Sequence, residues 1–114
     1  MAIEKIFAHI SCSDLERSKQ WYAKLFGRAA DAEPMQHLAE WHHGSDAGMQ
    51  LFENKASAGK STLTLIVNAL REEHERLMSR GLNPAAVEAG QKISLLRMSD
   101  PDGNLVVLAQ PARV

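Results

Sequence analysis

Residues 99–108, with the sequence SDPDGNLVVL, are expected to form a tight turn followed by a buried strand. Pro101 fixes φ for the second turn position, and Asp100 can accept a hydrogen bond from the backbone two residues further on. Gly103 tolerates the positive φ with which such turns end. The residues at 105–108 are all aliphatic, which predicts that the last strand enters the interior of a sheet. The side chains of this strand are therefore expected to point into the middle of the fold.

The composition predicts one ordinary globular domain over residues 1–114, because 45% of the residues are hydrophobic and 24% are charged. The formal net charge is −1 with the signs interspersed, which gives no basis for binding nucleic acid or an anionic membrane. Cys12 is the single cysteine, so no internal disulfide is possible and a reducing cytoplasm is expected. The N-terminus lacks the layout of a signal peptide, and no apolar run approaches the roughly 20 residues of a membrane helix.

Apolar and β-branched residues indicate a series of short strands along the chain. The strongest strand candidates are residues 3–12, 38–43, 48–53, 61–67 and 93–98, with weaker candidates at 29–35 and 84–87. A turn at 44–46 joins the second and third of these, and 55–60 is a short linker. The segment from Pro111 onward is expected to be loosely held.

Two helices are predicted from their end signals. The first begins with a capping box formed by Ser13 and Glu16 and ends at Gly27. The second begins after Asn68, which is expected to act as its N-cap, and ends at Gly81. Strand alternation places Cys12 on the helix side of its strand, where it is expected to be a small buried apolar residue.

An internal repeat emerges when the two helix starts are superposed. Leu15 then falls on Leu70, an offset of 55 residues, and the preceding strands also align. Each half contains a strand, a helix and about three further short strands. The chain is therefore predicted to consist of two βαβββ modules, at residues 1–54 and 61–110.

Three short motifs of the first helix, residues 14–18 (DLERS), 21–22 (WY) and 25–27 (LFG), together with the turn at 100–104 (DPDGN), resemble one known family. This is the glyoxalase/bleomycin-resistance/dioxygenase group, or vicinal oxygen chelate superfamily. The resemblance implies an α+β fold in which two βαβββ modules form a curled mixed sheet around a central cavity, often completed across a homodimer. Its members include lyases, dioxygenases, epimerases, resistance transferases and drug-sequestering proteins, so the resemblance carries the fold over but not the activity.

The resemblance also implies where a metal would bind, because the family's metalloenzymes hold one divalent ion with four His, Glu or Gln side chains. The matching positions in this chain are Phe7, Gln50, Thr62 and Val107. Phe7 and Val107 have no donor atoms, and only Gln50 is a suitable ligand. The resemblance therefore implies a member whose metal site has been vacated, and we expect no metal and no cofactor.

Strand alternation predicts which side chains face the cavity. The inward positions are Phe7, His9, Ser11, Gln50, Phe52, Thr62, Thr64, Leu105 and Val107. Such a mostly apolar set with a few polar groups is typical of a small-molecule pocket, and also of an ordinary, slightly polar barrel core. Trp41, which shares its strand face with His43, could add an aromatic wall or could pack in the core or a dimer interface.

The sequence leaves two roles possible for His9. An inward imidazole could act as a general base or anchor a ligand. It could equally be a hydrogen-bonded pocket residue without chemistry.

We therefore predict a homodimer that binds a small organic molecule through Phe7, His9, Trp41, Gln50, Phe52, Thr62 and Val107. Phe7, Trp41 and Phe52 would supply apolar contact, while His9, Gln50 and Thr62 would orient polar groups. One alternative is a metal-dependent lyase of the lactoylglutathione lyase type, or a dioxygenase, with an atypical site that uses His9, Gln50 and a histidine of the strand at 38–43. A second alternative is a structural dimerisation domain with a filled cavity.

Overall fold

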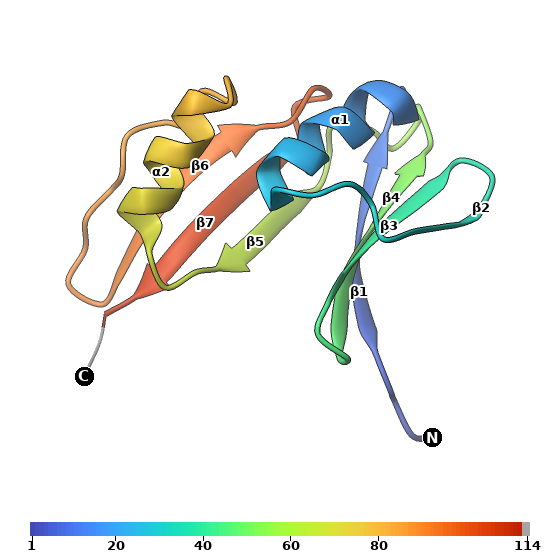
Figure 1. Ribbon diagram of the computed structural model, residues 1–114, viewed down its shortest axis with the longest axis horizontal. Coiled ribbons are helices and arrows are strands. Elements are labelled where there is room, and N and C mark those ends of the chain that lie inside the picture. Colours follow the sequence, from blue (N-terminus) through green and yellow to red (C-terminus); the bar gives the residue numbers. More distant parts are fainter. Residues whose placement is uncertain (113–114) are drawn as a thin grey trace.

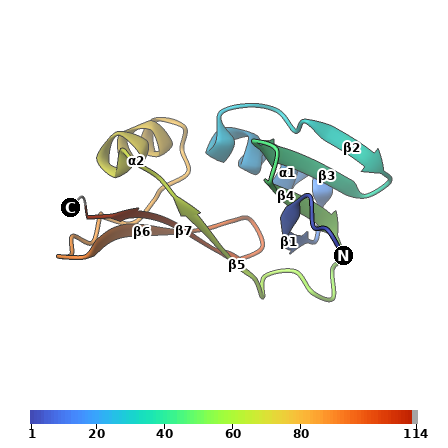
Figure 2. The same ribbon diagram turned by 90° about the horizontal axis from the view of Figure 1, so that it is seen from below.

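The computed structural model describes residues 1–112 as two β-sheets, each associated with one helix (Figure 1). The elements are β1 (Ile6–Cys12), α1 (Leu15–Phe26), β2 (Ala32–Met35), β3 (Leu38–His43), β4 (Ala47–Glu53), β5 (Thr62–Ile66), α2 (Leu70–Ser79), β6 (Ile93–Ser99) and β7 (Leu105–Pro111). Residues 54–61 carry the chain from one sheet to the other (Figure 2). Among these residues, no helix has the length and apolar character needed to cross a membrane.

The two halves of the chain have related topologies. The first sheet has the order β1-β4-β3-β2 and the second has the order β5-β7-β6. In each half the strand before the helix is an edge strand and pairs in parallel with the last strand of that half. The helices begin at Leu15 and Leu70, as the 55-residue repeat predicts. The predicted α+β fold of two related modules is confirmed.

The second sheet has one strand fewer than the first within the described residues. The weak strand predicted at 84–87 is wrong, because these residues form no strand: Ala85 donates to the carbonyl of Arg97 at 2.9 Å, and an isolated bridge joins the next residue, Glu88, to Leu95. Pro84 has no backbone N–H to donate to a ladder, and Asn83 before it has a positive φ of 51°. These two residues interrupt a regular strand, although the chain that follows them stays beside β6.

The helix N-termini also differ from the prediction. Asp14, and not Ser13, caps α1, because its side chain accepts a hydrogen bond from the backbone N–H of Arg17 at 3.2 Å. Ser13 is instead bonded to Asp102 of the second module. The predicted end of this helix is confirmed, since Gly27 adopts the left-handed conformation with φ 75°.

The predicted cap of α2 is wrong as well. The residue before α2 is Ala69, and the side chain of Asn68 makes no cap hydrogen bond. The backbone N–H of Leu70 is satisfied by Oε1 of Gln110 at 2.9 Å, while Nε2 of Gln110 donates to the carbonyl of Asn68. A residue 40 positions away therefore caps this helix.

The C-terminal strand is longer than predicted. Pro111 is not part of a loose tail, because β7 extends to it and it pairs with Ile93 in β6. The backbone N–H of Ala112 then donates to the carbonyl of Lys92 at 2.8 Å. Residues 113–114, the rest of the predicted loose tail, lie outside the described residues.

The core of the first module lies between α1 and one face of its sheet. Leu15, Tyr22 and Leu25 of α1 are buried there. They pack against sheet residues that are also buried, namely Ile10, Cys12, Ala39, Trp41, Met49 and Leu51. Burial raises the pKa of the Cys12 thiol to about 11, with a further contribution from the negative charge of Asp102, so the thiol is protonated and apolar as predicted.

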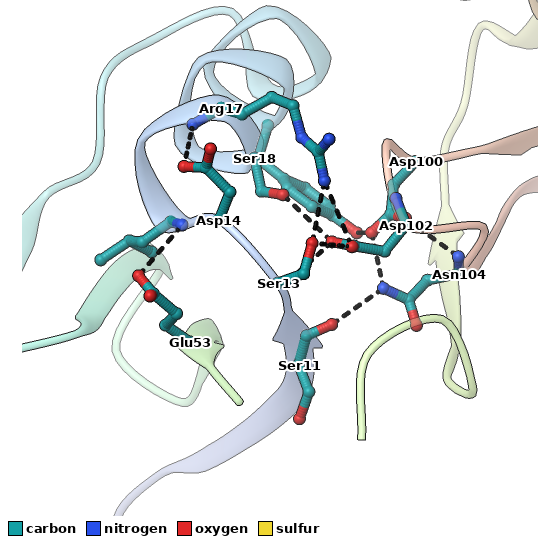
Figure 3. A network of polar contacts seen from close by, with 11 residues as sticks. Ser11, Ser13, Asp14, Arg17, Ser18, Glu53, Asp100, Asp102 and Asn104 are labelled. Atoms are coloured by element: carbon teal, nitrogen blue, oxygen red, sulfur yellow. Dashed lines mark hydrogen bonds and ion pairs between the residues drawn. The ribbon is translucent and has the colours of Figure 1, made fainter. Parts of the chain in front are cut away.

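A polar network joins the two modules where β1 ends and the turn before β7 lies (Figure 3). The Asn104 side chain is fully buried, and its Nδ2 donates to the carbonyl of Ser11 at 3.0 Å and to Asp100 at 2.7 Å. Its Oδ1 accepts a hydrogen bond from the backbone N–H of Ser61 at 2.9 Å. The hydroxyl of Tyr22 donates to the same oxygen of Asp100, Oδ2, over 2.7 Å. The turn at residues 100–104 is therefore the structural joint between the modules.

Candidate functional site

The candidate site is the face of the first sheet that lies opposite α1, which we call the open face. Side chains alternate along each strand, so the residues next to the buried Ile10, Trp41 and Met49 lie on this other face. The register brings three of them into one row, since His9 lies opposite Gln50 and Gln50 lies opposite Glu40. The sheet thus places an imidazole, an amide and a carboxylate side by side.

These polar groups form a continuous hydrogen-bonded chain, which we call the polar row. His9 Nδ1 lies 3.2 Å from Gln50 Oε1, and Gln50 Nε2 lies 2.9 Å from Glu40 Oε2. The second carboxylate oxygen, Glu40 Oε1, lies 3.0 Å from Nε2 of His42. The Gln50 hydrogen bond, followed by that of His42, lowers the pKa of Glu40 against the opposing effect of burial. These hydrogen bonds favour the charged carboxylate form of Glu40, even though the residue is only 8% exposed.

Aromatic rings flank the polar row. Phe7 makes an edge contact with the ring of His42, with centroids 5.8 Å apart, and Phe52 lies 6.0 Å from the ring of His9. Lys5 Nζ lies 5.3 Å from the centroid of Phe7, within the range of a cation–π contact. Apolar surface next to a few oriented polar groups is the composition expected of a small-molecule site.

The predicted site residues divide between the two sheets. Phe7, His9, Gln50 and Phe52 come together on the open face, as their strand positions predict. Thr62 and Val107 belong to the second sheet, where Thr62 pairs with Leu105 and Val107 with Thr64. The four positions that correspond to the family's metal ligands are therefore split between two sheets.

Trp41 is not part of the open face. It is fully buried on the opposite face, where its ring packs 5.6 Å from Phe26 and 6.2 Å from Tyr22. Its indole Nε1 donates to the carbonyl of Arg28 at 3.0 Å. Because α1 covers the face to which this side chain points, Trp41 packs in the core, which is the second of the roles considered for it.

The side chains present do not fit the family's divalent metal. Phe7 and Val107 offer no donor atom at two of the four expected positions. The groups that do converge, in the polar row, already bond to one another. No three His, Cys, Asp or Glu side chains within residues 1–112 are arranged to hold an ion.

Glu40 is a functional candidate that sequence reasoning missed, and it bonds to His42, one of the two histidines already considered in this strand. Both lie in the strand predicted at 38–43, two residues apart, so they share a face. A glutamate in the middle of such a strand is unusual, because charged side chains are rarely buried without a partner. That signal could have pointed to Glu40, but its partner Gln50 could be identified only once the strand register was known.

A large groove lies between the modules and is separate from the open face. It has a volume of about 870 Å³ and is lined by apolar residues of β1, α1 and β5, together with Arg28, Arg76 and Arg80. Two of these arginines have structural roles, since Arg76 donates to the carbonyls of Lys24 and Leu25 and Arg28 bonds to Asp31. None of the predicted ligand residues lines this groove.

Several solved structures are similar to this fold in their backbone but share little sequence identity with the chain. A glyoxalase/bleomycin resistance protein from Catenulispora acidiphila DSM 44928 superposes with a TM-score of 0.87 at 24% identity, covering 96% of this chain and 99% of that one. TnmS3, an antibiotic binding protein from Streptomyces sp. CB03234, gives 0.83 at 26% identity over 98% and 99% of the two chains. A bleomycin-binding protein complexed with bleomycin gives 0.79 at 18% identity over 96% and 99%.

No protein with curated annotation matches the sequence significantly. The sequence pattern of the glyoxalase-like domain, in contrast, matches residues 7–109, which is most of the chain. This match includes the whole polar row and the turn that joins the modules. The chain therefore belongs to the glyoxalase-like domain family, within the vicinal oxygen chelate superfamily that its sequence motifs resemble.

Proposed function

We propose that this protein binds a small, partly aromatic organic molecule on the open face and that binding uses no metal. The observation that carries the proposal is the polar row of His9, Gln50 and Glu40 between the rings of Phe7 and Phe52. The rings offer apolar contact, and the row offers oriented hydrogen-bonding groups. TnmS3 and the bleomycin-binding protein, which share the fold, are described as antibiotic-binding and bleomycin-binding proteins.

We further propose that a second copy of the chain completes the site. β1 and β5 are edge strands, and the exposed fractions of Ile6 and Ile66 on them are 68% and 66%. Unpaired strand edges with exposed apolar side chains are commonly covered in proteins. A homodimer would cover them and would bring Thr62 and Val107 of the second sheet toward an open face, as the family resemblance implies.

Titration of ¹⁵N-labelled protein with metal-free bleomycin and with indole tests the binding proposal. Shifts of the Gln50 side-chain amide and of the Phe7 and Phe52 backbone amides are expected. A Phe52→Ala variant should weaken these shifts, whereas His74→Ala on α2 should not. The proposal would be abandoned if both probes left the open face unperturbed while the protein sedimented as a dimer. Sedimentation as a monomer would contradict the proposed dimer. The titration would then test binding to the open face of a single chain.

A metal-dependent lyase or dioxygenase is the second candidate function, and it would require His9 and Gln50 to give up their mutual contact in order to bind an ion. In that case, supplementing the protein with Zn²⁺, Ni²⁺ or Mn²⁺ should produce turnover of the methylglyoxal–glutathione adduct. His9→Ala should then abolish turnover. Stoichiometric metal in the purified protein, with loss of probe binding after chelation, would favour this candidate over the metal-free one.

A further inference from the structure

The side-chain amide of Gln50 is oriented by its neighbour on β3. A carboxylate can only accept hydrogen bonds, so the group that faces Glu40 must be the Gln50 NH₂, whose Nε2 lies 2.9 Å from Glu40 Oε2. The amide oxygen then points the other way, toward β1. There it lies 3.2 Å from Nδ1 of His9.

This orientation determines which nitrogen of His9 carries the hydrogen. An amide oxygen can only accept, so Nδ1 of His9 must be the donor. In a neutral imidazole the other nitrogen, Nε2, then has a lone pair and no hydrogen. His42 has the opposite arrangement, because its Nε2 lies 3.0 Å from Glu40 Oε1 and must donate to it. Glu40 thus acts on both histidines, directly on His42 and through Gln50 on His9.

The acceptor on His9 is open to a ligand. His9 is exposed, and no residue among 1–112 makes a hydrogen bond to its Nε2. The ring of Phe52 lies 6.0 Å from the imidazole, so an aromatic molecule could contact this ring and His9 together.

We propose that Glu40 is a positioning residue that holds His9 in the Nδ1–H form, so that the open face selects aromatic ligands with an N–H or O–H donor. Indoles, phenols and anilides belong to this class. Aromatic ethers and N-methylated rings of the same size do not. This inference rests on the proposed function, because it names the ligand class of the same site.

The first test needs no ligand. Long-range ¹H–¹⁵N spectra of the free protein at pH 8 distinguish the two forms of a neutral imidazole. We expect the Nδ1–H form for His9 and the Nε2–H form for His42. Observation of the Nε2–H form at His9 would overturn the inference whatever the protein binds.

The Glu40→Gln variant tests the positioning role. Its amide can donate as well as accept, so Gln50 is no longer held in one orientation and His9 should become a mixture of both forms. Within residues 1–112 the exposed Glu33 bonds only to Lys19, so Glu33→Gln should leave His9 unchanged. A His9 signal that stays entirely Nδ1–H in Glu40→Gln would exclude Glu40 as the positioning residue. If Glu40→Gln does not fold, the wild-type spectrum still decides between the two forms.

A matched pair of probes tests the selectivity. Indole and 1-methylindole have nearly the same ring surface, but only indole can donate a hydrogen bond to Nε2. Loss of one such bond should weaken 1-methylindole binding about tenfold. His9→Phe should remove this difference and His74→Ala should preserve it. Equal affinities in the wild-type protein would overturn the inference. If neither probe reaches the open face, the proposed function fails and the imidazole spectra alone decide the present inference.

Discussion

Phe7 lies directly across the β1–β4 pair from Gly48, and its ring occupies the space that a side chain at position 48 would need. A Cβ built on Gly48 would lie 2.5 Å from Cε1 of Phe7 and 2.8 Å from its Cδ1. The backbone of Gly48 is not in the left-handed region, so glycine is needed here for space alone. This glycine therefore sets the position of one aromatic side of the candidate site.

Gly48→Ala should destabilise the protein by about 1–3 kcal/mol through overpacking, and should weaken indole binding by displacing Phe7. In a Phe7→Ala background the same substitution should cost less, because the Phe7 ring is gone and only the carbonyl oxygen of Trp41, 3.0 Å from the added Cβ, stays close. Urea denaturation of the four proteins measures both values. Equal costs in the two backgrounds would show that Phe7 is not the obstacle.

Gln110→Ala should destabilise the protein by about 1 kcal/mol, since it removes the acceptor that caps α2. Asn68→Ala is the matched control, because the Asn68 side chain makes no cap hydrogen bond and should change the free energy of unfolding by less than about 0.5 kcal/mol. Chemical denaturation distinguishes the two positions. A larger effect at Asn68 than at Gln110 would show that Asn68 caps α2, as the sequence predicts.

The order of the helices and of the main strands, and both helix starts at the 55-residue offset, could be predicted from local patterns, while the family resemblance together with strand alternation grouped Phe7, His9, Gln50 and Phe52. Strand alternation and helix periodicity are encoded within a few neighbouring residues. The cap of α2 could not be predicted, because Gln110 reaches it across 40 positions. The polar row depends on strand register in the same way, which is why Glu40 was missed. The role of Trp41 stayed open between cavity wall and core, because alternation separates the two faces of a strand without saying which one a helix covers.

Tyr22→Phe should lower the free energy of unfolding by about 1.5–3 kcal/mol, because a buried hydrogen bond to a carboxylate is lost. Burial, followed by the negative charge of Asp100, raises the pKa of Tyr22 above its ordinary value, so the phenol remains a donor. Ser79→Ala, at an exposed hydroxyl that donates to the carbonyl of Arg76, is the control and should cost less than about 0.5 kcal/mol. A Tyr22→Phe protein as stable as the control would show that the joint between the modules does not depend on this contact.

Stability should fall in acid partly through Asp31. The Arg28 guanidinium, at 3.0 Å, and the backbone N–H of His42 hold the pKa of Asp31 at about 2, below its ordinary value of 3.8. The folded state therefore favours the charged carboxylate, and this stabilisation is complete above about pH 4 and lost as the pH falls toward 2. Asp31→Asn should reduce the fall in melting temperature between pH 5 and pH 2. A parallel fall in the variant and the wild-type protein would argue against this assignment.

The alkylation rate of the buried Cys12 reports how often the structure around β1 and α1 opens. A thiol that is covered by α1 and has a pKa of about 11 reacts very slowly with iodoacetamide at neutral pH, because the thiolate is scarce and the reagent has no access. Alkylation then proceeds only when the structure around β1 and α1 opens, so its rate follows the frequency of that opening. Because Cys12 is the chain's single cysteine, one mass-spectrometric time course reports this event without any added label. A ligand bound on the open face of β1 would stabilise this region and lower the alkylation rate of Cys12, although it would not contact the sulfur.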